Sequence, residues 1–274
     1  MVKTYVLYHA NCPDGHGAAW AAWKALGEAW VEYVPVQHGD APPQMDDLSR
    51  IYILDFSYKR EVLQGLFNGA RELAVLDHHK SAQQDLEGLP FAHFNMHKSG
   101  AVMAWHSFHP AKTVPRLLEY VQDHDLWQYK LPYSREVRAW LNSYPRTFEV
   151  WDELAQELEE RNDDVIVEGK ACARLMRQSV EHMCGQVHFP VVAGVKMPVV
   201  NTAIYFSEVG EALLEKYPQY DVAAYYFDRA DGKRHWGLRS REHFDCSEVA
   251  KRMGGGGHRC AAGFVEEKVA VEDV

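Results

Sequence analysis

The chain has 274 residues, of which 47% are hydrophobic and 25% charged, and its formal net charge is −10. This composition is typical of a globular protein with enough apolar side chains for a sizeable core. The excess of acidic residues argues against a protein that binds long nucleic acid, because such binding takes most of its affinity from a basic groove. It is compatible with a small phosphorylated substrate held by a few local cations or metal ions.

The five cysteines are scattered along the chain, and no two of them form a CxxC pair. This argues against a disulfide framework and a zinc ribbon, and it indicates a reducing compartment. The first residues, MVKTYVLYHANC, contain an apolar run too short for a signal peptide, and no run of about 18 apolar residues predicts a membrane span. We therefore expect a cytoplasmic protein without a membrane partner.

The beginning of the chain alternates between predicted strands and helices, judged by β-rich apolar runs and by helical spacing of apolar residues. Strands are expected over 3–9, 30–36, 50–56 and 72–77, and helices over 17–27 and 59–70. Nearly continuous apolar strands separated by helices indicate a parallel sheet buried on both faces. Ligands of such sheets gather at the carboxyl ends of the strands.

The middle of the chain is predicted to be helical, and strands return in its last third. Helices are expected over 100–109, 114–127, 147–164, 165–187, 207–216 and 246–252, and strands over 195–201, 220–228 and 234–240. We predict an α/β fold in three parts: a catalytic domain with the parallel sheet at 1–130, a helical connector at 131–190, and a smaller α/β domain at 191–274. The active site is expected in the cleft between the first and last parts.

Three predicted neighbouring strands end on side chains that commonly bind metals. These side chains are His9 and Asp14 after the first strand, Asp55 after the next, and Asp77, His78 and His79 after the third. Each alone is more often turn chemistry or an ordinary surface residue, but their coincidence at three strand ends predicts a metal centre. Mixed carboxylate and imidazole ligands suit Mn²⁺, Fe²⁺ or Zn²⁺. Two such ions about 4 Å apart can activate water for displacement at phosphorus, and Asp55 is the natural bridging carboxylate.

A second signal is the glycine-rich stretch GGGGHRCAAGF at 254–264. Glycines let backbone N–H groups approach an anion closely, and His258 could donate a hydrogen bond to a phosphate oxygen. A flexible surface loop is the ordinary explanation of such a stretch. The ordered patterns on both sides, a capped helix at 245–253 and the apolar run CAAGF, favour a binding loop instead.

The motifs HANCPDG, ILDFS, LDHHKS, QDHDLW and GGGGHRCAAGF, in this order, resemble those of the DHH phosphoesterase superfamily. This superfamily includes RecJ-type exonucleases, oligoribonucleases, cyclic-dinucleotide phosphodiesterases and family II pyrophosphatases. The resemblance runs from residue 5 to residue 264. The GGGH motif of the DHH-associated domain sets the chain apart from the pyrophosphatase branch.

The resemblance implies two divalent metal ions, with Mn²⁺ the expected metal. The implied ligands are His9 and Asp14 for one ion, Asp55 as the bridge, and His78 and Asp125 for the other. Asp123 is a weaker candidate than Asp125 for the last position.

The resemblance also implies which residues act on the substrate. His79 would face the reacting phosphate, and Asp77 would orient its histidine neighbours, as metal-bound imidazoles require. In the C-terminal domain, the implied substrate-binding residues are Arg239, whose guanidinium matches two phosphate oxygens, and Gly256, Gly257 and His258 of the glycine stretch.

The first motif departs from the superfamily pattern. Many relatives carry a second Asp two residues after the one matched here to Asp14, where this chain has His16. His9 also lies five residues before Asp14, where four is common among the oligoribonucleases. His16 or Cys12 could replace the missing ligand, or water could complete the site. A soft Cys12 would favour Zn²⁺ or Fe²⁺ over Mn²⁺, although a small buried filler is the ordinary role of such a cysteine.

The function expected from these features is a metal-dependent phosphodiesterase or phosphohydrolase, in which a metal-activated water attacks phosphorus. Its expected substrates are short oligonucleotides or small nucleotide phosphoesters, without a track for long nucleic acid. One alternative is a polyphosphate or other small-phosphate hydrolase, and a more distant one is a catalytically silent nucleotide-binding module. The exact substrate, the cleavage polarity and formation of a homo-oligomer are left open.

Overall fold

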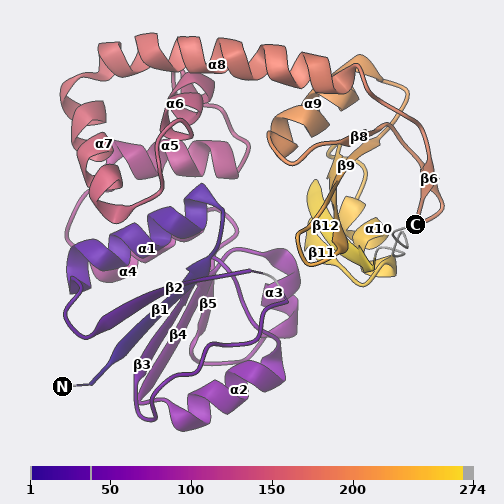
Figure 1. Ribbon diagram of the computed structural model, residues 1–274. Helices are drawn as coiled ribbons and strands as arrows, with labels where there is room; N and C mark the ends of the chain where they lie inside the picture. Colours follow the sequence, from indigo (N-terminus) through magenta and orange to yellow (C-terminus); the bar gives the residue numbers. More distant parts are fainter. Residues whose placement is uncertain (1, 38, 268–274) are drawn as a thin grey trace. The chain divides into compact units, whose positions relative to one another are not determined.

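The computed structural model describes residues 2–37 and 39–267 (Figure 1). The chain separates into two compact units, Met1–Ala173 and Arg174–Val274. The boundary lies inside helix α8 (Asn162–Cys184). Residues 131–190, expected to be a connector, are therefore divided between the two units, and the three-part division stays a prediction. Within the described part of the chain, no helix is both long and apolar enough to cross a membrane.

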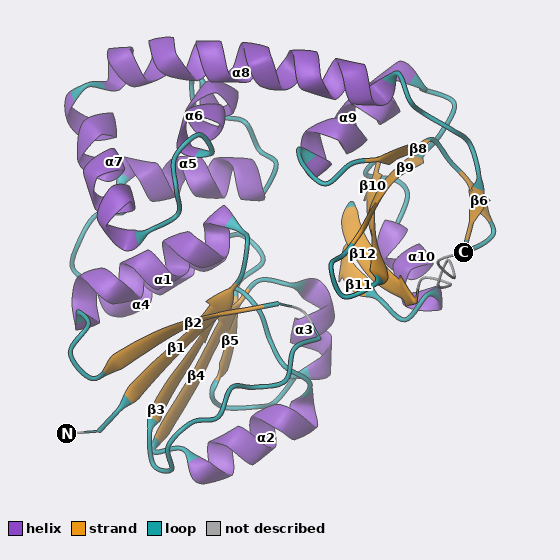
Figure 2. Cartoon of the chain, in the orientation of Figure 1, coloured by secondary structure: helices purple, strands orange, loops and turns teal. Residues whose placement is uncertain are grey.

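The N-terminal unit is built on a five-stranded parallel sheet with the order β2-β1-β3-β4-β5 (Figure 2). Its strands are β1 (Thr4–His9), β2 (Val31–Val36), β3 (Arg50–Leu54), β4 (Glu72–Asp77) and β5 (Ala92–Phe94). The first four agree with the predicted strands. β5 was not expected, because a strand of three residues is too short to show a periodic pattern.

Helices cover both faces of this sheet (Figure 1). One face is covered by α1 (Pro13–Leu26) and α4 (Gly100–Phe108), and α5 (Arg116–Asp125), α6 (Ser134–Leu141) and α7 (Phe148–Glu160) join the same hydrophobic cluster. The other face is covered by α2 (Arg60–Gly69), and α3 (Lys80–Asp85) follows β4. Side chains of β1 alternate between the two layers, with Val6 in the first and Tyr5 and Leu7 in the second. Burial on both faces explains why the strands are almost continuously apolar.

The helices differ from the sequence prediction in three ways. α1 begins at Pro13, four residues before the predicted start, so that Asp14 lies in its first turn. α3 and α6 were not predicted. The break between the helices predicted over 147–164 and 165–187 lies earlier, because the backbone of Arg161 leaves the helical conformation between α7 and α8. The Arg161 side chain forms ion pairs with Glu157 and Asp164, one on each side of the break.

The C-terminal unit contains a mixed five-stranded sheet with the order β11-β12-β10-β9-β8. Its strands are β8 (Val199–Asn201), β9 (Val222–Asp228), β10 (Lys233–Ser240), β11 (Gly256–His258) and β12 (Ala261–Glu267). Helices α9 (Phe206–Lys216) and α10 (Cys246–Arg252) belong to separate hydrophobic clusters of this unit. A short hairpin, β6 (Val191–Val192) and β7 (Val195–Lys196), precedes the sheet. The predicted α/β class, with a parallel N-terminal sheet and a smaller C-terminal α/β part, is confirmed.

The glycine-rich stretch forms an edge hairpin, whereas the sequence predicted an open loop. Strand β11 pairs antiparallel with β12, with Gly256 opposite Gly263 and His258 opposite Ala261. Gly257 has φ +139°, and a Cβ atom there would lie 2.6 Å from the carbonyl oxygen of Ala261, so only glycine fits. The glycines thus allow two strands to approach closely, which the sequence pattern alone did not distinguish from a phosphate-binding turn.

Candidate metal centre

The carboxyl ends of β1, β3 and β4 bring His9, Asp55 and His78 together. Oδ1 of Asp55 lies 3.1 Å from Nε2 of His78, and Oδ2 lies 3.4 Å from Nδ1 of His9. Asp55 therefore has an imidazole on each of its oxygens, and only 1% of the residue is exposed. This is the arrangement expected of a carboxylate that bridges two ions.

Asp55 also has an unusual backbone conformation. Its φ angle is 64°, in the left-handed region that Asp tolerates better than most residues. The backbone N–H of Asp55 donates to the carbonyl of Leu76 at 2.9 Å, which keeps it attached to β4. Such conformations cost of order 1 kcal/mol or more and concentrate at functional sites. Here the turn directs the Asp55 carboxylate between the two histidines.

Two of the groups of candidate ligand atoms lie on either side of Asp55. The first group consists of His9, Cys12 and Asp55, and the second of Asp14, His78 and Asp125. Within each group the atoms lie within 4.8 Å of one another. Asp14 is therefore placed with His78, whereas the sequence motif assigned it to the ion held by His9.

Asp14 is fixed in place by the start of α4. Its Oδ2 accepts the backbone N–H of Gly100 at 2.6 Å, and its Oδ1 accepts that of Ala101 at 2.9 Å. The first N–H groups of a helix lack partners within the helix and favour negative charge. A Cβ atom on Gly100 would lie 2.5 Å from Cβ of Asp55, so this glycine lets α4 approach both carboxylates. Sequence reasoning missed this support, because residues 14 and 100 share no motif.

Asp125 and Asp123 have different roles although they lie two residues apart on α5. Oδ2 of Asp125 lies 3.6 Å from Nε2 of His78, and 26% of its side chain is exposed. The Asp123 carboxylate accepts backbone N–H groups from Lys130 at 2.8 Å and Leu131 at 3.2 Å. Asp123 therefore holds the segment after α5, and the geometry favours Asp125 as the ligand.

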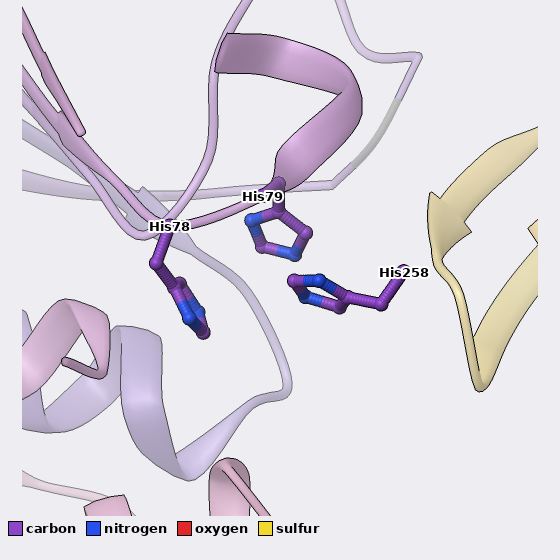
Figure 3. Close-up of side chains that lie close together, drawn as sticks. All are labelled: His78, His79 and His258. Atoms are coloured by element: carbon purple, nitrogen blue, oxygen red, sulfur yellow. The ribbon is translucent and has the colours of Figure 1, made fainter. Parts of the chain in front are cut away.

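Asp77 holds the two histidines that follow β4. Its Oδ1 accepts hydrogen bonds from the backbone N–H groups of His78 at 2.7 Å and His79 at 3.2 Å, and it lies 2.6 Å from Nδ1 of His79. Its Oδ2 accepts from the Ser57 hydroxyl at 2.6 Å. Figure 3 shows the rings of His78 and His79, whose centroids are 4.9 Å apart. Both Asp77 oxygens thus have donors, and the role of this carboxylate in orienting the histidines stays a prediction.

The electrostatics of the site favour bound cations. Burial, followed by the negative charges of Asp55 and Asp125, raises the pKa of Asp14 well above its usual range. Burial alone would lower the pKa of an imidazole. The hydrogen bonds that the rings make to Asp55 outweigh this effect of burial and raise the pKa of His9 and of His78 to about 11. The site therefore retains protons where divalent ions could bind instead. Imidazole, carboxylate and thiol donors together fit two such ions.

His16 does not join either ligand group. Its ring is stacked on Phe148 with centroids 5.0 Å apart, and meets Trp151 edge-on at 4.7 Å. Burial lowers the pKa of His16 to about 4, so the ring is neutral in this aromatic cluster. Of the two replacement ligands left open by the sequence, the geometry brings Cys12 to the site and leaves His16 in the core.

Arg239 and His258 are two of the four predicted substrate-binding residues, all of which lie in the C-terminal unit. Arg239, on β10, donates through Nη2 to the Ser207 hydroxyl and through Nη1 to the carbonyl of Leu238, both at 2.9 Å. A Cβ atom on Gly210 would lie 2.5 Å from Cγ of Arg239, so Arg239 packs closely on α9. His258, also labelled in Figure 3, ends β11. The expected roles of both residues in binding substrate stay predictions.

Comparison with known proteins bears on both units. A family model for the DHHA1 domain matches residues 191–273. Along the chain, this domain comes after the N-terminal unit. In that unit Asp55 directly follows β3, and β4 ends at Asp77, which His78 and His79 follow. The C-terminal part of the chain therefore matches the DHHA1 domain family.

The proteins similar to this chain are distant. Uncharacterized protein R106 of Acanthamoeba polyphaga mimivirus is 29% identical over 282 residues, which cover 94% of this chain and 66% of the viral protein. An exopolyphosphatase-related protein from Bacteroides fragilis has a similar structure, with a TM-score of 0.52 and 13% identity over 99% of this chain and 88% of that one. A pGpG-specific phosphodiesterase from Vibrio matches with a TM-score of 0.48 and 16% identity, over 99% of this chain and 94% of that one.

Proposed function

We propose that this protein is a member of the DHH phosphoesterase superfamily and a divalent-metal-dependent phosphoesterase. The observation that supports it best is the buried Asp55 carboxylate, which has His9 on one oxygen and His78 on the other. Two divalent ions held there would activate a water and stabilise negative charge that develops on phosphorus. The ligands and the residues that hold them come from rigid strand and helix ends, as a preorganised site requires.

Two residues beside the metal centre have separate roles: His79 would contact the substrate, and Asp77 would orient His79. Asp77 accepts the Nδ1 proton of His79, which fixes the orientation of that ring. Nε2 is then the His79 atom that serves the substrate, either by donating to a phosphate oxygen or by protonating the leaving oxygen. Ser57 and the backbone N–H groups hold Asp77 itself, so the imidazole does not have to be oriented anew in each turnover.

The proposed substrates are short oligonucleotides or small nucleotide phosphoesters. Basic residues of the C-terminal unit form ion pairs within that unit, which weakens any extended positive surface. These pairs are Arg229–Asp231, Lys233–Glu267, Arg234–Asp228, Lys251–Glu248 and Arg259–Asp245. Together with the net charge of −10, they favour recognition of one or two phosphates beside the scissile bond. Arg239 and His258 are the proposed contacts from this unit.

A panel of substrates tests the proposal. The protein with Mn²⁺ is assayed on a generic aryl phosphodiester, a dinucleotide, a short RNA, a long single-stranded DNA and polyphosphate, each with and without a chelator. Chelator-sensitive hydrolysis of the dinucleotide and short RNA supports the proposal. Faster release of phosphate from polyphosphate would identify the chain as a small-phosphate hydrolase instead. Nucleotide binding without turnover of any substrate would indicate a silent binding module.

A further inference from the structure

Cys12 lies beside the metal centre and not in the hydrophobic core. Its Sγ belongs to the ligand group with His9 and Asp55, whose donor atoms lie within 4.8 Å of one another. The thiol also hydrogen-bonds to the His9 side chain. In contrast to the usual small buried filler, Cys12 thus directs its sulfur at an imidazole and a carboxylate.

The backbone around Cys12 explains this direction. Cys12 is the N-cap residue of α1, but its side chain makes no capping hydrogen bond to the helix. The thiol is therefore not used for capping, the usual function of a side chain at this position. The fold consequently leaves this sulfur available to the ligand group with His9 and Asp55.

The spacing along α1 gives the same assignment. Asp14, two residues after Cys12, belongs to the second ligand group with His78 and Asp125. Many members of the superfamily that the motifs resemble carry two Asp residues separated by one position. If Asp14 corresponds to the second of them, Cys12 stands at the position of the first. In this alignment His16 corresponds to neither of the two Asp residues. Its packing against Phe148 and Trp151 agrees with that.

We propose that the thiolate of Cys12 is a metal ligand, which together with His9 and Asp55 forms a thiophilic site beside a second site of oxygen and nitrogen ligands. This inference rests on the proposed two-ion centre and specifies its composition. A thiolate carries the same single negative charge as the carboxylate it replaces. With Cys12, Asp14, Asp55 and Asp125 ionised and both histidines neutral, four negative charges would balance two divalent ions.

The consequence is a difference in metal preference between the two sites. Sulfur binds Zn²⁺, Fe²⁺ and Co²⁺ more strongly than it binds Mn²⁺ or Mg²⁺. The site of His9, Cys12 and Asp55 is therefore expected to select a thiophilic ion, whereas Asp14, His78 and Asp125 can accept Mn²⁺. The two positions would then be filled by different metals when several are available.

Cobalt absorption tests the proposal without measuring turnover. Metal-free full-length protein is titrated with Co²⁺, and the near-ultraviolet band of thiolate-to-cobalt charge transfer is recorded with the number of ions bound. We expect a band that saturates at about one Co²⁺ per chain. Cys12→Ser should lose the band and keep Co²⁺ at the second group. Cys172→Ser, on α8, is the matched control and should keep both.

A second variant and a second measurement separate ligation from simple misfolding. Cys12→Asp should bind Co²⁺ without the thiolate-to-cobalt band. Its preference for Zn²⁺ over Mn²⁺ should be at least about tenfold lower than that of the wild type. Zn²⁺ should also protect Cys12 of the wild-type protein from alkylation, as shown by mass spectrometry. Two bound ions without a thiolate band, or an unchanged band in Cys12→Ser, would overturn the role of Cys12 alone. Absence of Co²⁺ binding by the wild-type protein would overturn the two-ion centre itself.

Discussion

His78 and Asp55 form a buried imidazole–carboxylate contact, with Nε2 of the ring 3.1 Å from Oδ1 of the carboxylate. Only 4% of His78 and 1% of Asp55 is exposed to solvent. Because the other oxygen of Asp55 faces His9, this one carboxylate contacts a histidine of each ligand group. A change at Asp55 is therefore expected to disturb the whole centre.

We expect Asp55→Asn to lower turnover more than about 100-fold while the protein stays folded, since changes to mere supporting residues of metal ligands already cost 10–100-fold. Asn has nearly the same size and also tolerates the left-handed backbone at this position. The variant loses the negative charge between the two groups, so both ions should be lost. Metal content after dialysis, circular dichroism and phosphoesterase activity are measured together. Full turnover with unchanged metal content would contradict the bridging role.

The pair Asp125 and Asp123 gives a matched comparison on one helix. Asp125→Asn should reduce metal occupancy and activity with little effect on the melting temperature, because its carboxylate faces His78. Asp123→Asn should keep the metal but lower the unfolding free energy by about 1.5–3 kcal/mol, because its charged carboxylate accepts the backbone N–H groups of Lys130 and Leu131. Metal analysis and urea unfolding are carried out on both variants. The reverse pattern would mean that Asp123 is the ligand.

Metal binding should release protons near pH 7. Despite burial, hydrogen bonds to Asp55 raise the pKa of His9 and of His78 to about 11, so both rings are protonated in the metal-free protein. Because a ligating imidazole must give up that proton, and a ligating Asp14 or Cys12 gives up any proton that it retains, we expect at least two protons per chain on saturation. A pH indicator in weakly buffered solution measures them during titration with Mn²⁺. Asp123→Asn, which keeps the metal ligands, is the control and should release the same number.

Asp77 should contribute to acid stability. Burial alone would raise the pKa of Asp77, but the charge of His79 and the hydrogen bonds from His79 and Ser57 outweigh it and lower the pKa to about 2. The folded state thus binds this proton less readily than the unfolded chain, whose Asp pKa is about 3.9. The stabilisation is present above pH ~4 and is lost as the pH falls towards ~2, by about 2 kcal/mol in total.

Urea unfolding of the metal-free protein over this pH range checks the contribution of Asp77. Asp77→Asn should be less stable than the wild type near neutral pH, and the difference between the two should shrink as the pH falls. Ser57→Ala removes one hydrogen bond from the same carboxylate and should show a smaller change in the same direction. A difference that stays constant from pH 6 to acid would show that Asp77 is not ionised in the folded state.

Much of the fold followed from local sequence patterns. The runs KTYVLYH and RIYILDF are apolar at nearly every position, which only a strand buried on both faces requires. The break at Arg161 was placed three residues too late, because Asn162, Asp163 and Asp164 can each begin a helix and the sequence does not choose between them. The hairpin of β11 and β12 was missed for a different reason: glycines permit a phosphate-binding turn and a close strand pair equally well.

The site was predictable where strand ends defined it and not where distant segments met. Asp55 and His78 follow two adjacent parallel strands, so their proximity follows from the sheet order alone. The grouping of Asp14 and Cys12 depended on the exact start of α1, which sequence patterns fix only to within a few residues. Gly100 supports Asp14 across 86 residues of sequence, and no local pattern encodes such a contact.

Substrate length provides the last prediction. We expect two- to five-nucleotide substrates to be hydrolysed faster than long single strands at physiological salt, with a shallow dependence of affinity on salt. Each phosphate neutralised by Lys or Arg releases counterions, so affinity grows with length only along a continuous basic track. In the C-terminal unit, Lys233 and Arg234 lie 2.7 Å and 2.8 Å from carboxylates, and Arg239 donates to Ser207. These cations can reach few additional phosphates.

A double comparison decides whether such a track exists. Binding of single strands of increasing length is measured at several salt concentrations for the wild type and for Asp228→Asn, which releases Arg234 from its ion pair. The wild type should gain no affinity after a few nucleotides. Because Arg234 is released in the variant, the variant should bind longer strands more tightly and show a steeper salt dependence. If the wild-type affinity instead keeps increasing past about ten nucleotides with a steep salt slope, the protein has a long nucleic-acid track, and the assignment to short substrates is wrong.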